Sequence, residues 1–182
     1  MLEIMQHPHS VLYETAVEIP ADDILSKKIQ TLIFEMKETL RSEDYGVAIA
    51  APQVGTSLRL FIVSGRVFAA DESEAFDSAK HPDLVCINPT IVTTSRKTEE
   101  MQEGCLSVRG KWGKVARAEK VTLKALDEKG ETFSRGASGL LAQIFQHEMD
   151  HLNGILYIDK ATDIWDDEKE EKENEPNDHE KA

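Results

Sequence analysis

The stretch Gln146-His147-Glu148-Met149-Asp150-His151 decides how the rest of the chain is interpreted. It lies inside a pattern of apolar residues that predicts a helix at Gly139–Leu152. Residues four apart on a helix are separated by about 40° around the axis and about 6 Å along it. His147 and His151 therefore project from one face, where they can bind one metal ion. Glu148 is adjacent to the first of these ligands and can reach a water on the ion.

The same pattern has a simpler explanation, because two histidines at this spacing can also lie on an exposed helix surface. The flanking apolar residues indicate instead that much of the helix is buried; they are Leu140, Leu141, Ile144 and Phe145. Imidazole and carboxylate groups that are buried without partners are costly. We therefore favour a metal site over surface decoration.

A tetrahedral hydrolytic site needs a third protein ligand and an open position for water. The chain has two cysteines, Cys86 and Cys105. Cys86 lies in an apolar run that indicates a buried strand, so we expect it to be a small buried hydrophobe, the commoner role of a lone cysteine. Cys105 lies in Glu103-Gly104-Cys105-Leu106-Ser107 and is the best candidate for the ligand. Sequence spacing alone does not bring it to the helix.

Hydrophobic periodicity elsewhere predicts a mixture of helix and strand. Apolar residues at three- and four-residue spacing predict a first helix at residues 22–40. Strands are predicted at residues 58–63, 85–92, 120–126 and 132–134. Residues 45–55 are too irregular for a long helix, and residues 64–82 are expected to form a polar excursion on the surface. The expected fold class is α+β.

Length and charge limit the classes of function. The 182 residues suit one domain with a hydrophobic core. Residues 163–182 contain ten acidic and three basic residues, so they carry −7 of the net charge of −13. We expect a catalytic domain at residues 1–162 and a disordered acidic tail at residues 163–182. The negative charge argues against direct binding of nucleic acid.

The chain shows no secretion signal and no apolar run that approaches the ~20 residues needed to cross a bilayer. We therefore expect a soluble cytoplasmic protein without a membrane partner. Two cysteines are also too few for a disulfide framework, which agrees with a reducing compartment.

Three segments together resemble the signature motifs of peptide deformylases. Residues 46–53 resemble the motif G-x-G-[aliphatic]-A-A-x-Q, with Ala48 in place of the usual second glycine. Residues 103–107 match E-G-C-L-S in full, and residues 146–151 match Q-H-E-x-D-H in full. The resemblance covers roughly residues 4–159. It implies a fold in which antiparallel strands pack around a central metal-binding helix.

The resemblance also implies roles for individual residues. The metal ligands would be Cys105, His147 and His151, with water in the fourth position. Glu148 would be the general acid and base, while the Gln53 amide and the Leu106 backbone N–H would hydrogen-bond the formyl oxygen. Substrate contacts would come from Gly46, Val47, Ala48, Gly104 and Ile144. The family's ion is usually ferrous iron, and zinc, nickel or cobalt can occupy the same site.

The activity implied is removal of the N-formyl group from the formyl-methionine of newly synthesised polypeptides, with release of formate. The partners would be N-formyl-methionyl nascent polypeptides, met in transient proximity to the ribosome. Two alternatives stay open at this point. H-E-x-x-H also occurs in metalloendopeptidases, although these do not need the E-G-C-L-S segment. A non-enzymatic or weakened peptide-binding paralogue is the other, because the Ala48 methyl could intrude on the substrate if φ were positive there.

Overall fold

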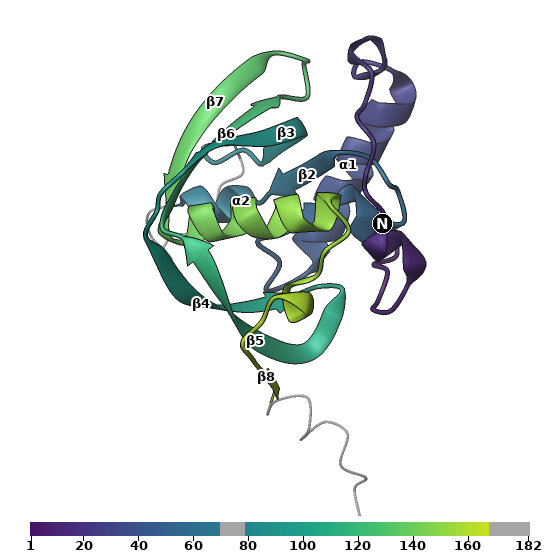
Figure 1. Ribbon diagram of the computed structural model, residues 1–182. Helices are drawn as coiled ribbons and strands as arrows, with labels where there is room; N and C mark the ends of the chain where they lie inside the picture. Colours follow the sequence, from purple (N-terminus) through teal and green to yellow (C-terminus); the bar gives the residue numbers. More distant parts are fainter. Residues whose placement is uncertain (70–78, 168–182) are drawn as a thin grey trace, which may run out of the picture.

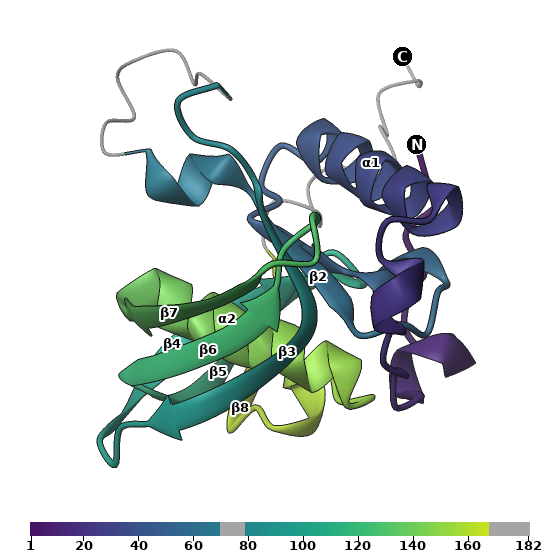
Figure 2. The ribbon, with the colours of Figure 1, turned by 90° about the horizontal axis from the view of Figure 1, so that it is seen from above.

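The computed structural model describes residues 1–69 and 79–167 (Figures 1 and 2). Much of the surface excursion expected at residues 64–82 lies outside these residues. Its first part forms a short 3-10 helix, η4 (Gly65–Phe68). Four other 3-10 helices connect the larger elements: η1 (Ser10–Tyr13), η2 (Ala21–Asp23), η3 (Ala51–Val54) and η5 (Tyr157–Asp159).

Within the described residues the strands form two sheets, and the larger has five antiparallel strands in the order β1-β2-β3-β6-β7. Its strands are β1 (Ala48–Ala50), β2 (Leu60–Val63), β3 (Leu84–Thr94), β6 (Lys120–Leu126) and β7 (Thr132–Ser138). Four of them lie where the apolar alternation predicts strands. The fifth, β1, is a three-residue edge strand inside the segment that was judged too irregular for a helix.

The smaller sheet has three strands in the order β4-β5-β8. They are β4 (Thr98–Cys105), β5 (Val108–Ala118) and β8 (Asp163–Asp166). The sequence analysis did not predict β4 and β5, because β4 is mostly polar and exposed and offers little apolar alternation. The two strands form a hairpin that closes beside Cys105, through the pair Cys105↔Val108.

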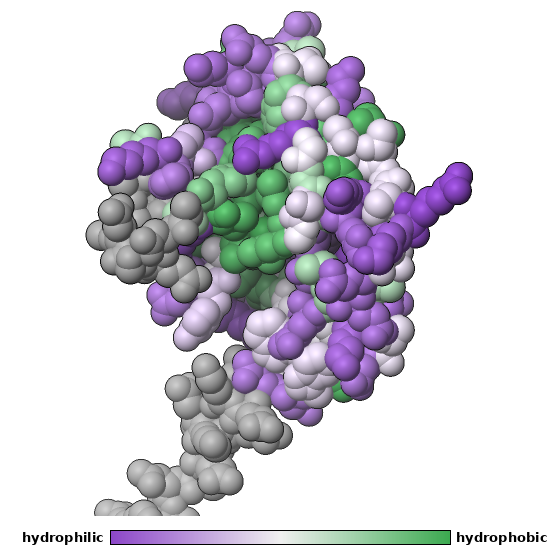
Figure 3. Space-filling view, turned by 90° about the vertical axis from the view of Figure 1, so that its left-hand side faces the viewer, coloured by the Kyte–Doolittle hydropathy of each residue, from purple (hydrophilic) through white to green (hydrophobic). Residues whose placement is uncertain are grey.

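Helix α2 (Gly139–Leu152) has the bounds that the sequence predicts. It lies between the two sheets, with β3, β6 and β7 on one side and β4 and β5 on the other (Figure 1). Its apolar residues, among them Ile144 and Phe145, pack in one core cluster with the strands of the larger sheet. On the side where α2 begins, apolar side chains gather in a hollow that the core leaves open (Figure 3). The α+β fold class and the central helix are confirmed.

Helix α1 (Lys27–Ser42) begins later than the predicted residue 22, because Ser26 caps it by accepting a hydrogen bond from the backbone N–H of Ile29 at 3.3 Å. Its buried face packs on Ile49 and Ile62 in a second core cluster. The alternation of side chains along β1 then points Ala48 and Ala50 to the cluster around α2. Strand β1 is therefore held between α1 and α2.

The C-terminal segment differs from the disordered tail that was expected at residues 163–182. Residues 163–166 form β8, which pairs with β5 from Lys114↔Asp163 to Lys111↔Asp166. The prediction of disorder rested on the acidic composition of this segment and gave little weight to its two apolar residues, Ile164 and Trp165. It could not foresee that the open edge of β5 would pair with this segment. Residues 168–182 lie outside the described part of the chain. The domain therefore extends at least four residues beyond the predicted boundary at 162.

Candidate metal centre and active site

The three predicted metal ligands converge from two elements. Cys105 is the last residue of β4, while His147 and His151 face the same side of α2. One ligand atom from each residue lies within 4.8 Å of the other two. The Cys105 Sγ atom is 3.2 Å from His151 Nε2, and the two imidazole rings are 4.9 Å apart at an angle of 75°. The fold thus brings Cys105 next to the histidines of α2, which sequence spacing alone could not predict.

The surroundings of the three side chains fit a divalent cation. His151 is 1% exposed, and its Nδ1 atom lacks a hydrogen-bond partner among the described residues. Burial holds the pKa of His151 well below its ordinary value, so it presents the neutral imidazole that a metal requires. Burial opposes charge on His147 too, but its hydrogen bonds with Cys105 and to the Glu103 carboxylate outweigh burial and raise the pKa of His147. One thiol and two imidazoles in this contact form a set of ligands typical of zinc and iron sites.

Glu103 orients the first histidine. Its Oε2 atom accepts a hydrogen bond from His147 Nδ1 at 2.9 Å, which leaves Nε2 to face Cys105 and His151. Burial alone would raise the pKa of Glu103, but hydrogen bonds from Arg117 and His147 outweigh it and lower that pKa to about 2. Glu103 is therefore a carboxylate at neutral pH and an acceptor for His147.

A buried ion-pair network fixes Glu103 in turn. The Arg117 guanidinium donates to both oxygens of Glu103, at 2.7 and 2.8 Å, and to Asp150 Oδ2 at 2.6 Å. Lys160 donates to the other oxygen of Asp150 at 2.6 Å. Since all these charges are paired, their burial is compensated. The network joins β4, β5 and α2 behind the metal ligands.

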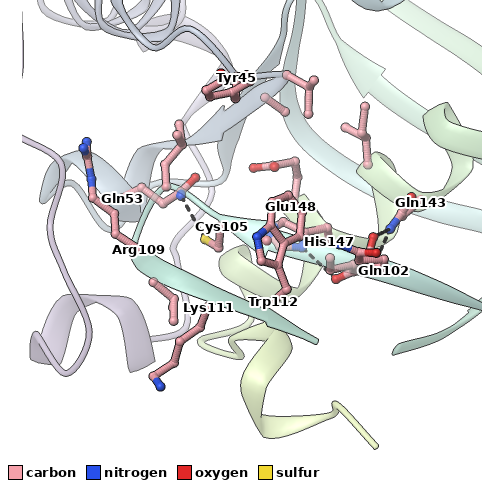
Figure 4. Close-up of a pocket in the computed structure, with 18 of the residues that line it drawn as sticks. Tyr45, Gln53, Gln102, Cys105, Arg109, Lys111, Trp112, Gln143, His147 and Glu148 are labelled. Atoms are coloured by element: carbon pink, nitrogen blue, oxygen red, sulfur yellow. Dashed lines mark hydrogen bonds and ion pairs between the residues drawn. The ribbon is translucent and has the colours of Figure 1, made fainter. Parts of the chain in front are cut away.

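Glu148 is 3% exposed, and its Oε2 atom has no hydrogen-bond partner among the described residues. Burial raises the pKa of Glu148 to about 7; the nearby His147 lowers it and the nearby Glu103 raises it. The carboxyl group lines the same cavity as Cys105 and His147 (Figure 4). A carboxyl group with a pKa near neutrality and an unused oxygen is suited to accept a proton and release it again.

Gln53 reaches the centre from the opposite wall. Its Oε1 atom accepts from the backbone N–H of Ala50 at 2.8 Å, which turns the amide nitrogen towards Cys105 Sγ at 3.4 Å and Ser107 Oγ at 3.2 Å (Figure 4). Leu106 lies in the turn between β4 and β5, next to Cys105. The Gln53 amide nitrogen, one of the two predicted hydrogen-bond donors, thus lies beside the sulfur ligand, and Leu106 follows that ligand in the chain.

A cavity of about 380 Å³ opens onto this centre. One wall is the segment before and within β1, another is the end of β4 with its turn, and the floor is the first half of α2. Every residue predicted to contact substrate lines this cavity, namely Gly46, Val47, Ala48, Gly104 and Ile144. The cavity lies between two open strand edges, β1 and β4, which suits an extended peptide.

Ala48 does not adopt the conformation that would have disturbed substrate binding. Among the described residues other than glycine, only Asn88 has a positive φ. Ala48 is 7% exposed and packs in the core cluster that surrounds α2. Its methyl group is therefore accommodated by the protein rather than forced upon a ligand.

Sequence reasoning assigned no role to several residues that shape the site. Arg117 holds Glu103, and Asp150 holds Arg117 in turn. Asp150 lies within the quoted helix stretch, and Glu103 opens the cysteine segment. The pairing of Arg117 with Glu103 spans fourteen residues across a hairpin that the sequence did not reveal. Trp112, on β5, also lines the cavity. Contacts between these two strands can be identified only once the register of β4 and β5 is known.

Comparison with known proteins gives a consistent result. The family model described as Polypeptide deformylase matches residues 1–166. The peptide deformylase of Halothermothrix orenii is 44% identical over 79% of this chain and 84% of its own. That of Dehalococcoides mccartyi (strain CBDB1) is 42% identical over 86% of this chain and 83% of its own.

Solved structures extend the likeness to three dimensions. A peptide deformylase from Synechococcus elongatus in complex with actinonin has a TM-score of 0.75 and 36% identity, covering 89% of this chain and 79% of its own. The peptide deformylase of Thermotoga maritima has a TM-score of 0.74 and 31% identity, covering 90% and 99%. These likenesses span the elements that build the centre described above. The chain belongs to the polypeptide deformylase family.

Proposed function

We propose that this chain hydrolyses the N-formyl group of formyl-methionyl polypeptides, with Cys105, His147 and His151 as metal ligands and Glu148 as the group that moves protons. The observation that supports this most is the contact of Cys105 with His151 beside the buried, unpaired oxygen of Glu148. A divalent ion held by the three ligands would supply Lewis acidity and lower the pKa of a water molecule towards about 7.

The proton steps fall to Glu148. Its carboxylate takes a proton from the attacking water as the oxygen bonds to the formyl carbon. It then gives that proton to the peptide nitrogen as the carbon–nitrogen bond breaks, which yields a free amino terminus and formic acid, and the acid ionises to formate at neutral pH. The pKa near 7 suits both directions of transfer. Since no proton is lost or gained overall, Glu148 returns to its starting state.

Two donors from this chain stabilise the negative charge that develops on the formyl oxygen. The Gln53 amide nitrogen already points to the cysteine ligand, where a small polar substrate atom would meet it. The Leu106 backbone N–H follows the same cysteine in the chain. Fixed donors in a water-poor cavity contribute to catalysis because they need no reorganisation when the charge forms.

The substrate is a nascent polypeptide, which the protein would meet in the cytoplasm close to the ribosome. Among the described residues no helix is long and apolar enough to cross a membrane. We expect ferrous iron to be the physiological ion, with zinc, nickel or cobalt as replacements. A site of one cysteine and two histidines accepts several metals, so availability in the cell decides among them.

The direct test is formate release from formyl-Met-Ala-Ser by enzyme purified without oxygen and supplied with ferrous ion. An unformylated peptide with internal bonds serves as the parallel substrate. We expect formate from the first and no cleavage of the second. Cleavage of internal bonds without formate release would favour the metalloendopeptidase, and binding of formyl peptide without turnover would favour the non-enzymatic paralogue.

A further inference from the structure

Trp112 covers the backbone of the residue that precedes the cysteine ligand. A Cβ atom placed on Gly104 would lie only 3.0 to 3.3 Å from three carbons of the Trp112 six-membered ring. The indole therefore packs directly on Gly104, where a side chain would be displaced. Trp112 and Gly104 both line the cavity, and the indole stands in front of His147 and Glu148 (Figure 4).

Strand β8 places an acceptor for this indole. Trp112 and Trp165 are directly paired across β5 and β8, so their side chains share one face of the sheet. Asp167 lies two residues beyond Trp165, and its backbone N–H continues the ladder by donating to Gly110 O at 2.8 Å. The period of two along a strand puts Asp167 on the same face. Its Oδ2 atom accepts a hydrogen bond from Trp112 Nε1 at 3.1 Å.

The neighbouring aspartate provides an internal comparison. Asp166 pairs with Lys111 across the ladder and therefore faces the opposite side of the sheet. It forms an ion pair with Lys111 at 2.5 Å, in which both side chains are about half exposed or more. Asp166 does not line the cavity, whereas Asp167 does. Asp166 is the last residue of β8 and Asp167 follows it, so the two aspartates are adjacent in the chain but have different neighbours.

We propose that Asp167 is a positioning residue that holds Trp112 on Gly104, and that this indole is a specificity-determining wall for the peptide that follows formyl-methionine. The inference rests on the proposed function. Ile144, at 4% exposure, belongs to the deep end of the cavity, where the residue bearing the formyl group must reach the metal ligands. Trp112 is only partly buried and is linked to Asp167 at the rim, so it meets the chain beyond that residue.

The consequence concerns binding more than chemistry. If the indole lost its acceptor, it could leave Gly104 and widen the cavity next to the substrate backbone. Fewer contacts would then be made in the ground state and the transition state alike, which raises KM and leaves kcat nearly unchanged. The metal ligands, Glu148 and Gln53 make no contact with Asp167 among the hydrogen bonds that define the centre.

The test compares four proteins loaded with the same metal: wild type, Asp167→Ala, Asp167→Asn and Asp166→Ala. We expect Asp167→Ala to raise KM for formyl-Met-Ala-Ser several-fold, with kcat within about twofold of wild type. Asp167→Asn should stay close to wild type, because its amide oxygen still accepts from the indole. Asp166→Ala should also stay close to wild type, because it removes only an exposed ion pair.

A spectrum of the indole N–H groups adds a readout independent of turnover. The chain has two tryptophans, and Trp112→Phe identifies the signal of Trp112 by removing it. In Asp167→Ala this signal should shift to the position of an indole without a protein acceptor, while Asp166→Ala should leave it in place. Adding Trp112→Phe to Asp167→Ala should raise KM little further, because one contact has already been lost.

Three results would overturn the inference: an unchanged KM in folded Asp167→Ala, equal rises in KM for Asp167→Ala and Asp166→Ala, or a rise in Asp167→Asn as large as in Asp167→Ala. Failure of the proposed function is a different result, since wild type would then release no formate. In that case, calorimetric titration of Met-Ala-Ser into wild type and Asp167→Ala still compares the peptide affinity of the two proteins, and so tests the role of Trp112 without turnover. Equal affinities would reject it.

Discussion

At the scale of single residues, Glu148 differs from the other acidic groups near the centre. Glu103 has both oxygens occupied and a pKa of about 2, whereas Glu148 has a free oxygen and a pKa of about 7. The hydrogen bonds from Arg117 and His147 keep Glu103 ionised, whereas burial raises the pKa of Glu148 more than the nearby His147 lowers it. Two carboxyl groups that flank the same histidine thus have different roles.

The role of Glu148 predicts the effect of Glu148→Gln. The amide keeps the size of the side chain but cannot accept a proton, so kcat for deformylation should fall by about 10²–10⁴-fold. Metal content and melting temperature should stay near those of wild type, since Glu148 is outside the ligand set. Steady-state formate release with metal analysis of the same samples measures both. Near-normal turnover by the metal-loaded variant would remove Glu148 from the mechanism.

The packing of Ala48 predicts that Ala48→Gly brings no gain in binding. The buried methyl group would be lost from the core, and glycine in a strand costs about 0.5–1 kcal/mol of stability. KM for formyl-Met-Ala-Ser should not change, because the methyl group packs with the core around α2. Denaturant unfolding and steady-state kinetics on both proteins test this. A clearly lower KM for the glycine variant would mean that the methyl group does hinder the substrate.

The residues of the centre could be predicted to different extents. His147 and His151 followed from helical geometry, and Cys105 and Gln53 from the resemblance of short segments to family motifs. Arg117 and Asp150 could not be predicted, because Arg117 reaches Glu103 only through the hairpin register, and Asp150 acts through its contact with Arg117. Glu103 and Asp150 lie within the quoted motifs, but Arg117, which links them, lies outside every motif.

At the scale of elements, the sequence predicts helix α2 well and strand β4 poorly. Helix α2 has a clear stripe of apolar residues because it is buried between two sheets, and the sequence predicts its bounds to the residue. Strand β4 has an open edge that faces the cavity, and its residues are mostly polar, so no alternation marks it. A polar strand at an open sheet edge, such as β4, has little apolar alternation by which the sequence could reveal it.

Strand β8 predicts how C-terminal truncations behave. A chain that ends at Thr162 loses every pair between β5 and β8 and uncovers Trp112, so it should melt at a lower temperature and bind formyl-Met-Ala-Ser more weakly. A chain that ends at Asp167 keeps the ladder and the contact with Trp112, so its melting temperature and KM should match the full chain. Thermal unfolding and kinetics on the two truncated proteins distinguish the cases. Equal behaviour of both would show that β8 contributes nothing.

At the scale of the whole molecule, the fold brings three distant parts of the chain to one point. The two sheets enclose α2 (Figure 1). The core on either side of β1 fixes the wall that carries Gln53. The fold class and most strands of the larger sheet could be predicted from apolar periodicity. The division into two sheets could not, because it depends on the polar hairpin of β4 and β5 and on β8.

The central claim is that one metal ion, held by Cys105, His147 and His151, makes this molecule a deformylase. Its most direct test is a titration of metal-free protein with ferrous ion in the absence of oxygen, followed by formate release from formyl-Met-Ala-Ser. Turnover should rise from near zero in proportion to added ion and level off at one ion per chain, and Cys105→Ala should show no such rise at that loading. Full turnover in the metal-free protein, or none at any loading of wild type, would contradict the account.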